Sequence, residues 1–235
     1  MRRLIGAIVL SVALATSAAP ALAQTIHPVD LDGKIVNLVV PEGYCELDRS
    51  NPRHREIFEH YYGDDDSGIR VLGFFVECEG LSEFTTIADD LDRVADNGVY
   101  YTDLNPDGSV KTFPGMDRGE FVRMFAELLP ELPLAVAKQS LREALEESGN
   151  PPMEISQSGL TDYDSDALYM SMIGTAELSS GRRIVGGSTA STFVHERFIF
   201  LGLSRLMENE DSIERLSDDA RQLMADFLAA NPNSD

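Results

Sequence analysis

The segment "DLNPDGSV", which begins at Asp103, places oxygen-bearing side chains at the spacing of a calcium-binding loop. Asp103, Asn105 and Asp107 stand at alternate positions, and Gly108 occupies the sixth position, where such loops turn sharply. The twelfth position should be a bidentate glutamate, and this chain has Pro114 there. Pro106 and Gly108 also have the positions that a type I turn with a glycine bulge requires. We therefore expect a hairpin turn and no calcium site.

A second acidic segment, "DYDSD", carries Asp162, Asp164 and Asp166. Three like charges on one face of a strand would repel one another, so we expect this segment to be a loop. The sequence leaves open whether the two acidic loops meet and share a cation. The four histidines are His27, His54, His60 and His195. They lack the spacing of metal ligands on a helix, so we expect no metal site and no cofactor.

Ser188 and His195 are the pairing in the chain that suggests hydrolase chemistry. A nucleophilic serine needs a base within hydrogen-bonding distance, and in many hydrolases it lies on a Gly-x-Ser-x-Gly turn between a strand and a helix. Ser188 instead follows two glycines in "GGST". We therefore expect no catalytic residue here. A hydrolase whose site is assembled only in three dimensions is kept as the alternative function.

The surrounding segment "RRIVGGSTAS" resembles the activation site of chymotrypsin-like proteases, where cleavage after a basic residue releases an Ile-Val-Gly-Gly terminus. Cleavage would fall between Arg183 and Ile184. The chain beyond this point is too short for the catalytic double barrel and holds no Gly-Asp-Ser-Gly-Gly loop. The match is therefore chance, and we expect Gly186 and Gly187 to mark a bulge or sharp bend in a long strand.

The chain is strongly acidic, and this limits its partners. Its 235 residues include 40 Asp and Glu against 19 Lys and Arg, which gives a formal net charge of −21. Such a field repels phosphate backbones and anionic lipid head groups. We therefore expect no nucleic-acid partner and no electrostatic attachment to membranes, and we expect a protein or a small ligand as the partner.

The amino terminus has the pattern of a secretory signal. Two arginines precede an apolar run over residues 4–15, and "ALA" at 21–23 supplies the small-x-small cleavage signature. The run is too short for a membrane anchor, and no cysteine lies at the cut. We expect residues 1–23 to be a cleaved signal peptide and the remaining chain, from Gln24, to be periplasmic or secreted.

Cys45 and Cys78 are the two cysteines of the chain. Disulfides persist in exported proteins, and the sequence shows neither a Cys-x-x-Cys pair nor a nearby base that would activate a thiol. We therefore expect a structural Cys45–Cys78 disulfide. Pairing of a strand at 34–40 with a strand at 69–78 would bring the two cysteines together on either side of one helix.

Hydrophobic periodicity and turn residues divide the chain into strands and helices. The expected strands cover 34–40, 69–78, two arms within 99–113, 153–160, 167–178 and 183–207. The expected helices cover 49–63, 81–97, 117–129, 134–148 and 211–230. This order predicts an α+β fold, an antiparallel β-sheet covered by helices, in a single domain with a C-terminal amphipathic helix.

Residues 117–150 are expected to form a helical hairpin inserted between β segments. Asp117 and Glu120 have the spacing of a capping box, and an apolar stripe follows them. The stripe consists of Phe121, Met124, Phe125 and Leu128. These four residues are the candidates for partner binding, because exposed methionine and phenylalanine make adaptable contact surfaces. The alternative is that this stripe simply packs on the sheet.

The segment "VPEGYC", the late hairpins and the C-terminal helix resemble the PsbP-like α+β fold. They also resemble a group of uncharacterised secreted proteobacterial proteins that begin with Pro-Glu-Gly-Tyr-Cys. The resemblance spans residues 34–228, and the insertion at 117–150 departs from the compact PsbP-like pattern. It implies an accessory or assembly role without catalysis, and no functional residue is carried over. The function we expect is therefore that of an exported, non-catalytic accessory or binding domain.

Overall fold

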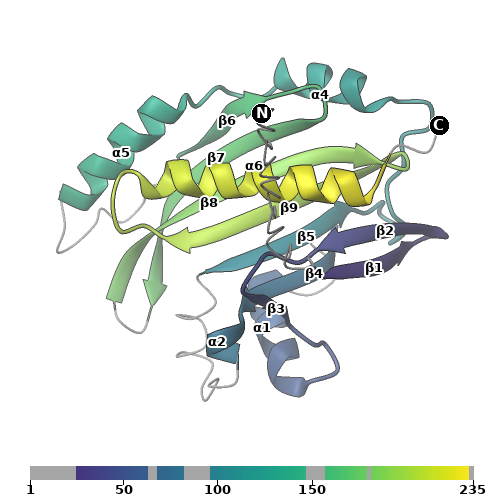
Figure 1. The fold of residues 1–235 in the computed structure, drawn as a ribbon, viewed down its shortest axis with the longest axis horizontal. Helices are drawn as coiled ribbons and strands as arrows, with labels where there is room; N and C mark the ends of the chain where they lie inside the picture. Colours follow the sequence, from purple (N-terminus) through teal and green to yellow (C-terminus); the bar gives the residue numbers. More distant parts are fainter. Residues whose placement is uncertain (1–24, 63–67, 82–95, 147–156, 179–180, 233–235) are drawn as a thin grey trace, which may run out of the picture.

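A seven-stranded antiparallel sheet forms the centre of the protein (Figure 1). The computed structural model describes residues 25–62, 68–81, 96–146, 157–178 and 181–232. The strand order is β3-β4-β5-β9-β8-β7-β6. The bounds are β3 Tyr44–Glu46, β4 Ile69–Glu77, β5 Asn97–Asp103, β6 Gln157–Tyr163, β7 Ala167–Leu178, β8 Gly181–Val194 and β9 Arg197–Leu206. The α+β class predicted from the sequence is confirmed. The predicted signal peptide lies outside the described residues, as does most of the predicted helix at 81–97.

A separate β-hairpin precedes the sheet. Strands β1 (Ile26–Leu31) and β2 (Lys34–Val39) pair through a turn in which Asp32 and Gly33 have φ angles of 51° and 82°. Both angles are positive, as a type I′ hairpin turn requires. The expected pairing of β2 with β4 is therefore wrong, because β2 pairs with β1 and β4 pairs with β3 and β5.

The predicted long strand at 183–207 is two strands, β8 and β9. They are joined by a tight turn at His195 and Glu196, whose φ angles are 50° and 63°. The turn is held from outside: Phe113 donates its N–H to the carbonyl oxygen of Glu196 at 2.9 Å, and Gly115 donates to the Glu196 carboxylate at 3.1 Å. Neither turn residue is Gly or Asn, so the usual sequence signal of such a turn is absent here.

Gly186 and Gly187 do not form the bulge that we expected. The register of β8 with β7 and with β9 runs unbroken through both positions. A Cβ atom at Gly186 would lie 2.5 Å from Cε of Met207, and one at Gly187 would lie 2.6 Å from Cγ of Met172. The two glycines instead leave room for methionine side chains to lie across the strand.

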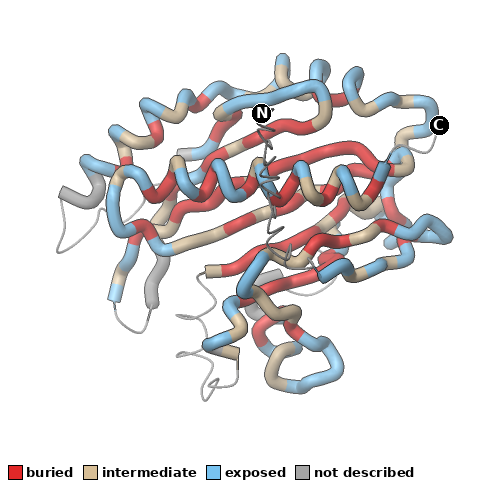
Figure 2. Tube along the Cα trace, in the orientation of Figure 1, coloured by how far each residue is buried: buried red, intermediate tan, exposed pale blue. Residues whose placement is uncertain are grey.

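The two faces of the sheet are covered by different elements. Helix α6 (Ser212–Ala230) lies across one face, in front of the sheet in Figure 1, and its buried stripe packs on alternate residues of β9 such as Ile199 and Leu201. The β1–β2 hairpin extends the same layer. The other face, which carries Phe198 and Phe200, is covered by α1 (Pro52–Tyr62) near β4 and by α4 (Arg118–Ala126) near β8. Figure 2 shows that buried residues concentrate in the strands between these layers.

Helices α4 and α5 (Leu134–Glu146) do not pack as the expected helical hairpin. Phe121 of α4 belongs to the aromatic cluster on one face, whereas Leu141 of α5 is fully buried in the core that includes α6. The chain crosses between the two layers along the edge strand β6. There Leu160 donates to Pro130 at 2.7 Å, and Leu132 donates to Leu160 at 2.8 Å. The 117–146 segment is therefore part of both layers.

The predicted disulfide between Cys45 and Cys78 is present. Cys45 lies in β3, opposite Val76 of β4, and Cys78 follows directly after β4, so the two Cα atoms are 4.9 Å apart. Helix α1 lies within the loop that the disulfide closes, and Asn51 caps it by accepting a 2.9 Å hydrogen bond from the N–H of Arg53. Among the described helices, none is long and apolar enough to span a membrane.

Candidate functional site

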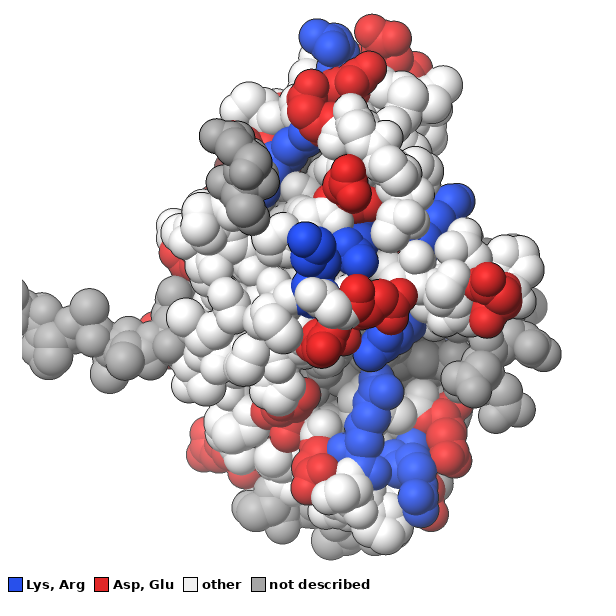
Figure 3. Space-filling view, turned by 90° about the vertical axis from the view of Figure 1, so that its right-hand side faces the viewer, with Lys and Arg blue, Asp and Glu red and all other residues white. Residues whose placement is uncertain are grey.

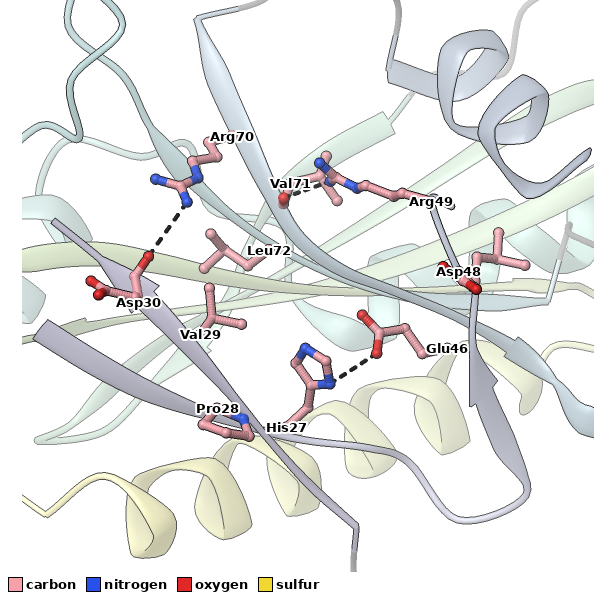
Figure 4. A pocket seen from close by; sticks show the side chains of 11 residues that line it. His27, Pro28, Val29, Asp30, Glu46, Asp48, Arg49, Arg70, Val71 and Leu72 are labelled. Atoms are coloured by element: carbon pink, nitrogen blue, oxygen red, sulfur yellow. Dashed lines mark hydrogen bonds and ion pairs between the residues drawn. The ribbon is translucent and has the colours of Figure 1, made fainter. Parts of the chain in front are cut away.

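A charged cleft of about 600 Å³ opens between β1 and the β3–β4 edge of the sheet (Figure 4). Three runs of neighbouring residues line it, 27–30 from β1, 46–49 from β3 and the segment after it, and 70–72 from β4. Val29 and Leu72 form an apolar floor, while charged side chains stand around it. The cleft therefore combines a surface for an apolar group with several ionic contacts.

His27 and Glu46 are in contact at one side of the cleft, with 2.9 Å between Nδ1 and Oε2. Burial raises the pKa of the Glu46 carboxyl, and the charges of His27 and Arg49 partly offset this effect. The pairing joins β1 to β3 across the cleft. An imidazole held in this way by a carboxylate presents its second nitrogen to the solvent space.

Arg49 and Arg70 stand on the opposite wall, one on each side of Val71 (Figure 4). Arg49 donates from Nη2 to the carbonyl oxygen of Val71 at 2.7 Å, and its guanidinium lies 4.5 Å from the ring centroid of Phe58. Figure 3 shows that Lys and Arg side chains on the face where the β1–β2 hairpin lies are interspersed with Asp and Glu side chains.

A second cavity, which we call the aromatic pocket, lies between α4 and the sheet. Its volume is about 310 Å³. The lining residues come from α4 and the turn after it, from β7 to β9, and from the end of β5 and the segment that follows it. They are Asp103, Lys111, Phe113, Phe121, Phe125, Leu129, Leu168, Met170, Ser191, Phe198 and Phe200. The ring centroids of Phe121, Phe113 and Phe125 lie 4.2, 4.9 and 5.2 Å from that of Phe198. These close edge-to-face contacts make the walls rigid and apolar.

The hollow exists because one residue in the floor is small. Ser191 lies in β8 directly between Leu168 of β7 and Phe200 of β9. It is 2% exposed, and it is one of the residues that line the pocket. At the mouth, the ammonium of Lys111 lies 5.3 Å from the ring centroid of Phe113. Burial raises the pKa of Asp103, and the positive charge of Lys111 opposes that shift.

The four candidate partner-binding residues divide between two environments. Phe121 is 1% exposed and Phe125 is partly buried, and both line the aromatic pocket. Met124 and Leu128 are 38% and 72% exposed and are absent from its lining. The stripe therefore packs on the sheet through its phenylalanines. Asp117 caps α4 as predicted, by accepting a 2.8 Å hydrogen bond from the N–H of Glu120.

The segment from Asp103 to Val110 is a turn, as predicted. Gly108, with φ of 81°, donates its N–H to the carbonyl oxygen of Asn105 at 2.9 Å. The Asp107 carboxylate accepts from the backbone and hydroxyl of Ser109, which lowers its pKa. Side chains that would ligate calcium thus bind the turn itself.

The second acidic segment is a loop only in part, because Asp162 lies in β6 and is paired with Tyr169 of β7. Asp162 also pairs with Arg221 at 2.7 Å, and Asp166 pairs with Arg118 at 3.2 Å. Asp164 accepts hydrogen bonds from the backbone and from the hydroxyl of Tyr169. Across the part of the chain that the structure describes, no three His, Cys, Asp or Glu side chains come together as a metal site.

Ser188 and His195 are not brought together. They lie seven positions apart along β8 and its end, and an extended chain rises about 3.3 Å per residue, so their separation is on the order of 20 Å. Ser188 is buried and its hydroxyl points to the carbonyl oxygen of Met170 at 3.5 Å. His195 occupies the β8–β9 turn.

No family model matches the chain, and no curated protein matches it. The two cavities are therefore interpreted from their own chemistry. The sequence did not predict the charged cleft, because His27, Glu46, Arg49 and Arg70 come from three separate segments. The helical spacing of Phe121 and Phe125 predicted these two residues of the pocket, but its other phenylalanines have the pattern of ordinary strand residues.

Proposed function

We propose that the protein is an exported, non-catalytic binding domain that holds a small, mainly apolar ligand in the aromatic pocket. The observation that supports this function is the pocket itself, a cavity of about 310 Å³ with aromatic walls and the hydroxyl-bearing Ser191 in its lining. Sites for small molecules are concave and mostly apolar, with a few polar groups that fix orientation, and this volume is at their lower limit. The ligand is thus a compact molecule, such as a single or fused ring.

The polar groups of the pocket define how such a ligand lies. Ser191 at the floor offers one hydrogen bond to the buried end of the ligand. Asp103 and Lys111 at the mouth accommodate a polar group at the other end. The stacked rings of Tyr101 and Phe200, with centroids 4.7 Å apart, hold the wall beneath that mouth in place.

Export is part of the proposal and rests on two observations. The Cys45–Cys78 disulfide is typical of proteins outside the reducing cytosol, and the first residues have the pattern of a cleaved signal. The resemblance of "VPEGYC" to secreted PsbP-like proteins agrees with an accessory role. Intact-mass measurement of the secreted protein is expected to give a chain that starts at Gln24.

Ligand binding is tested with a neutral fluorescent probe, N-phenyl-1-naphthylamine. We expect saturable fluorescence enhancement with the wild-type protein and none with Ser191→Leu, whose side chain fills the hollow. Leu128→Ala, in the exposed turn after α4, is the matched control and should bind as the wild type does. Equal binding by a folded Ser191→Leu protein, checked by its melting temperature, would contradict the proposal.

One observation favours the alternative, a hydrolase. The His27–Glu46 pair in the charged cleft has the geometry of a general base and its orienting carboxylate. The described residues that line this cleft include no Ser, Thr or Cys, so water would be the nucleophile. Hydrolysis of p-nitrophenyl acetate or p-nitrophenyl phosphate that disappears in His27→Ala would favour this function over simple binding.

A further inference from the structure

One face of the Phe200 ring is turned toward the hollow of the aromatic pocket. Phe200 of β9 lies in one cross-strand row with Tyr101 of β5 and Ser191 of β8. Tyr101 stacks on the ring, with 4.7 Å between the centroids and 4° between the planes, so it covers the face toward β5. The other face looks toward β8, where the small Ser191 leaves it open to the pocket. Because the face of an aromatic ring carries partial negative charge, this wall favours a positively charged group.

The Asp103 side chain lies on the same face of the sheet as these rings. Asp103 follows Tyr101 by two positions in β5, and it is one of the residues that line the pocket. It is partly buried, and burial raises the pKa of its carboxyl. Among the described residues, no hydrogen bond or ion pair holds this carboxylate, and the charge of Lys111 is the effect that opposes the shift. A carboxylate that has lost part of its hydration in this way is stabilised by a cation beside it.

Lys111 is the other charged residue of the lining, and its charge acts less strongly on the pocket. Its ammonium lies 5.3 Å from the ring centroid of Phe113, and the residue is exposed. Water and salt screen an exposed ammonium on a flexible side chain more than they screen a partly buried carboxylate. The contact with Phe113 also shows that a cation lies against a ring at this mouth. The net charge of −21 adds a long-range field that attracts cations and repels anions.

We propose that the ligand of the aromatic pocket is an organic cation, whose apolar part fills the hollow over Ser191 and whose ammonium group lies between the Phe200 ring and the Asp103 carboxylate. This inference rests on the function proposed above and names the chemical class of its ligand. Aromatic rings together with a carboxylate stabilise an ammonium group by cation–π and ionic contacts. A ligand carboxylate in the same place would be repelled by Asp103. The volume of about 310 Å³ limits the ligand to one or two rings with a short amine arm.

The test compares three probes of nearly the same size, 2-phenylethylammonium, 2-phenylethanol and phenylacetate, which are positive, neutral and negative. Calorimetric titration of the purified protein at constant ionic strength gives the affinity for each. Displacement of N-phenyl-1-naphthylamine shows whether the probes occupy the aromatic pocket. We expect the cation to bind about tenfold more tightly than the alcohol, as one charge-assisted contact allows, and the anion to bind most weakly.

Asp103→Asn removes the negative charge and keeps the shape of the side chain. We expect it to weaken binding of 2-phenylethylammonium about tenfold and to leave the affinity for 2-phenylethanol within about twofold. Asp218→Asn is the matched control, because it makes the same change in net charge at an exposed position of α6, on the opposite face of the sheet. Its affinities for the three probes should equal those of the wild type.

Lys111→Gln is a second variant, made at an exposed side chain. It removes the positive charge that opposes a cation in the pocket, so binding of 2-phenylethylammonium should become about twofold tighter or more. This variant keeps the test decisive if Asp103→Asn loses the alcohol as well as the cation, which would show that the substitution has damaged the pocket. Unchanged or weaker binding of the cation to Lys111→Gln would then contradict the inference.

The outcomes for the wild type separate this inference from the proposed function. If the alcohol displaces the naphthylamine and the cation binds no more tightly, the pocket takes neutral ligands and the inference is wrong. Tighter binding of phenylacetate than of the cation would overturn it too, since Lys111 would then select the ligand. If neither the naphthylamine nor any of the three probes binds, the proposed function fails, and the inference fails with it.

Discussion

Asn37 and Asn231 lie 194 residues apart and exchange hydrogen bonds as two paired strand residues would. The N–H of Asn37 donates to Oδ1 of Asn231, and Nδ2 of Asn231 donates to the carbonyl oxygen of Asn37, both at 2.8 Å. The side chain of Asn37 also donates to Ala230 at 2.9 Å. The Asn231 side chain, at the end of α6, thus bonds both backbone groups of Asn37 in β2. This contact fixes the β1–β2 hairpin, and with it one wall of the charged cleft.

Asn231→Ala is expected to lower the free energy of unfolding by about 2 kcal/mol, because it leaves the partly buried N–H and carbonyl groups of Asn37 without these partners. Urea denaturation measures the change. Asn231→Asp keeps an acceptor for the Asn37 N–H but sets a buried carboxylate against the carbonyl oxygens of Asn37 and Phe227, so it should be at least as destabilising. A stability of Asn231→Ala within about 0.5 kcal/mol of the wild type would show that the contact is not structural.

Local chemistry accounts for the parts of the fold that the sequence predicted. The buried stripe of α6, the cap at Asp117 and the turn ending at Gly108 each depend on residues within a few positions of one another. The disulfide followed from the cysteine count and the signal pattern. Strand β1 was missed although Asp32-Gly33 is a strong hairpin signal, because Pro28 in "IHPVDL" weakens the strand pattern.

Long-range packing accounts for what the sequence did not predict. The β8–β9 turn depends on contacts from Phe113 and Gly115, far away in the chain. The separation of α4 from α5 depends on the crossing segment at 130–132 beside β6. The aromatic pocket has the same origin, since Ser191 lies between large residues of the two neighbouring strands.

Loss of the disulfide should destabilise the protein without changing its fold. In the chain-entropy model, a bridge across 33 positions contributes about 3–4 kcal/mol, so Cys45→Ala combined with Cys78→Ala should lose about that much stability. Urea denaturation with and without reductant measures the effect. Reductant should destabilise the wild type and leave the double variant unchanged. A loss below about 1 kcal/mol would mean that the reduced chain keeps the β3–β4 contact by other means.

Two glycine substitutions should differ in cost because their neighbours differ in freedom. A Cβ at Gly159 would lie 2.7 Å from the carbonyl oxygen of Pro130 and 2.8 Å from Cβ of Leu132, so the crossing segment would have to move. A Cβ at Gly187 would meet Met172, which is 53% exposed and flexible. We expect Gly159→Ala to cost about 2 kcal/mol and Gly187→Ala less than about 1 kcal/mol.

Thermal and urea denaturation of the two glycine variants side by side measure this difference. Each serves as the control for the other, since both add one methyl group to a strand of the same sheet. Equal costs, or a larger cost at Gly187, would show that the segment at 130–132 does not pack against β6 as described.

His195 should make stability depend on pH below neutrality. Burial lowers the pKa of its imidazole, and the positive charges of Lys34 and Arg197 lower it further, while a hydrogen bond with the backbone of Ile35 opposes the shift. The unfolded chain therefore takes up the proton first. As pH falls below about 6.5, the free energy of unfolding decreases until the folded protein is protonated too.

His195→Asn tests this, because asparagine tolerates the positive φ of this turn and does not titrate. Urea denaturation at pH about 7.5 and about 5.5 should show a smaller decrease in the free energy of unfolding for this variant than for the wild type. The many carboxylates titrate in both proteins, so the difference between them reports on His195 alone, and equal losses would mean that the folded chain protonates this residue as readily as the unfolded one.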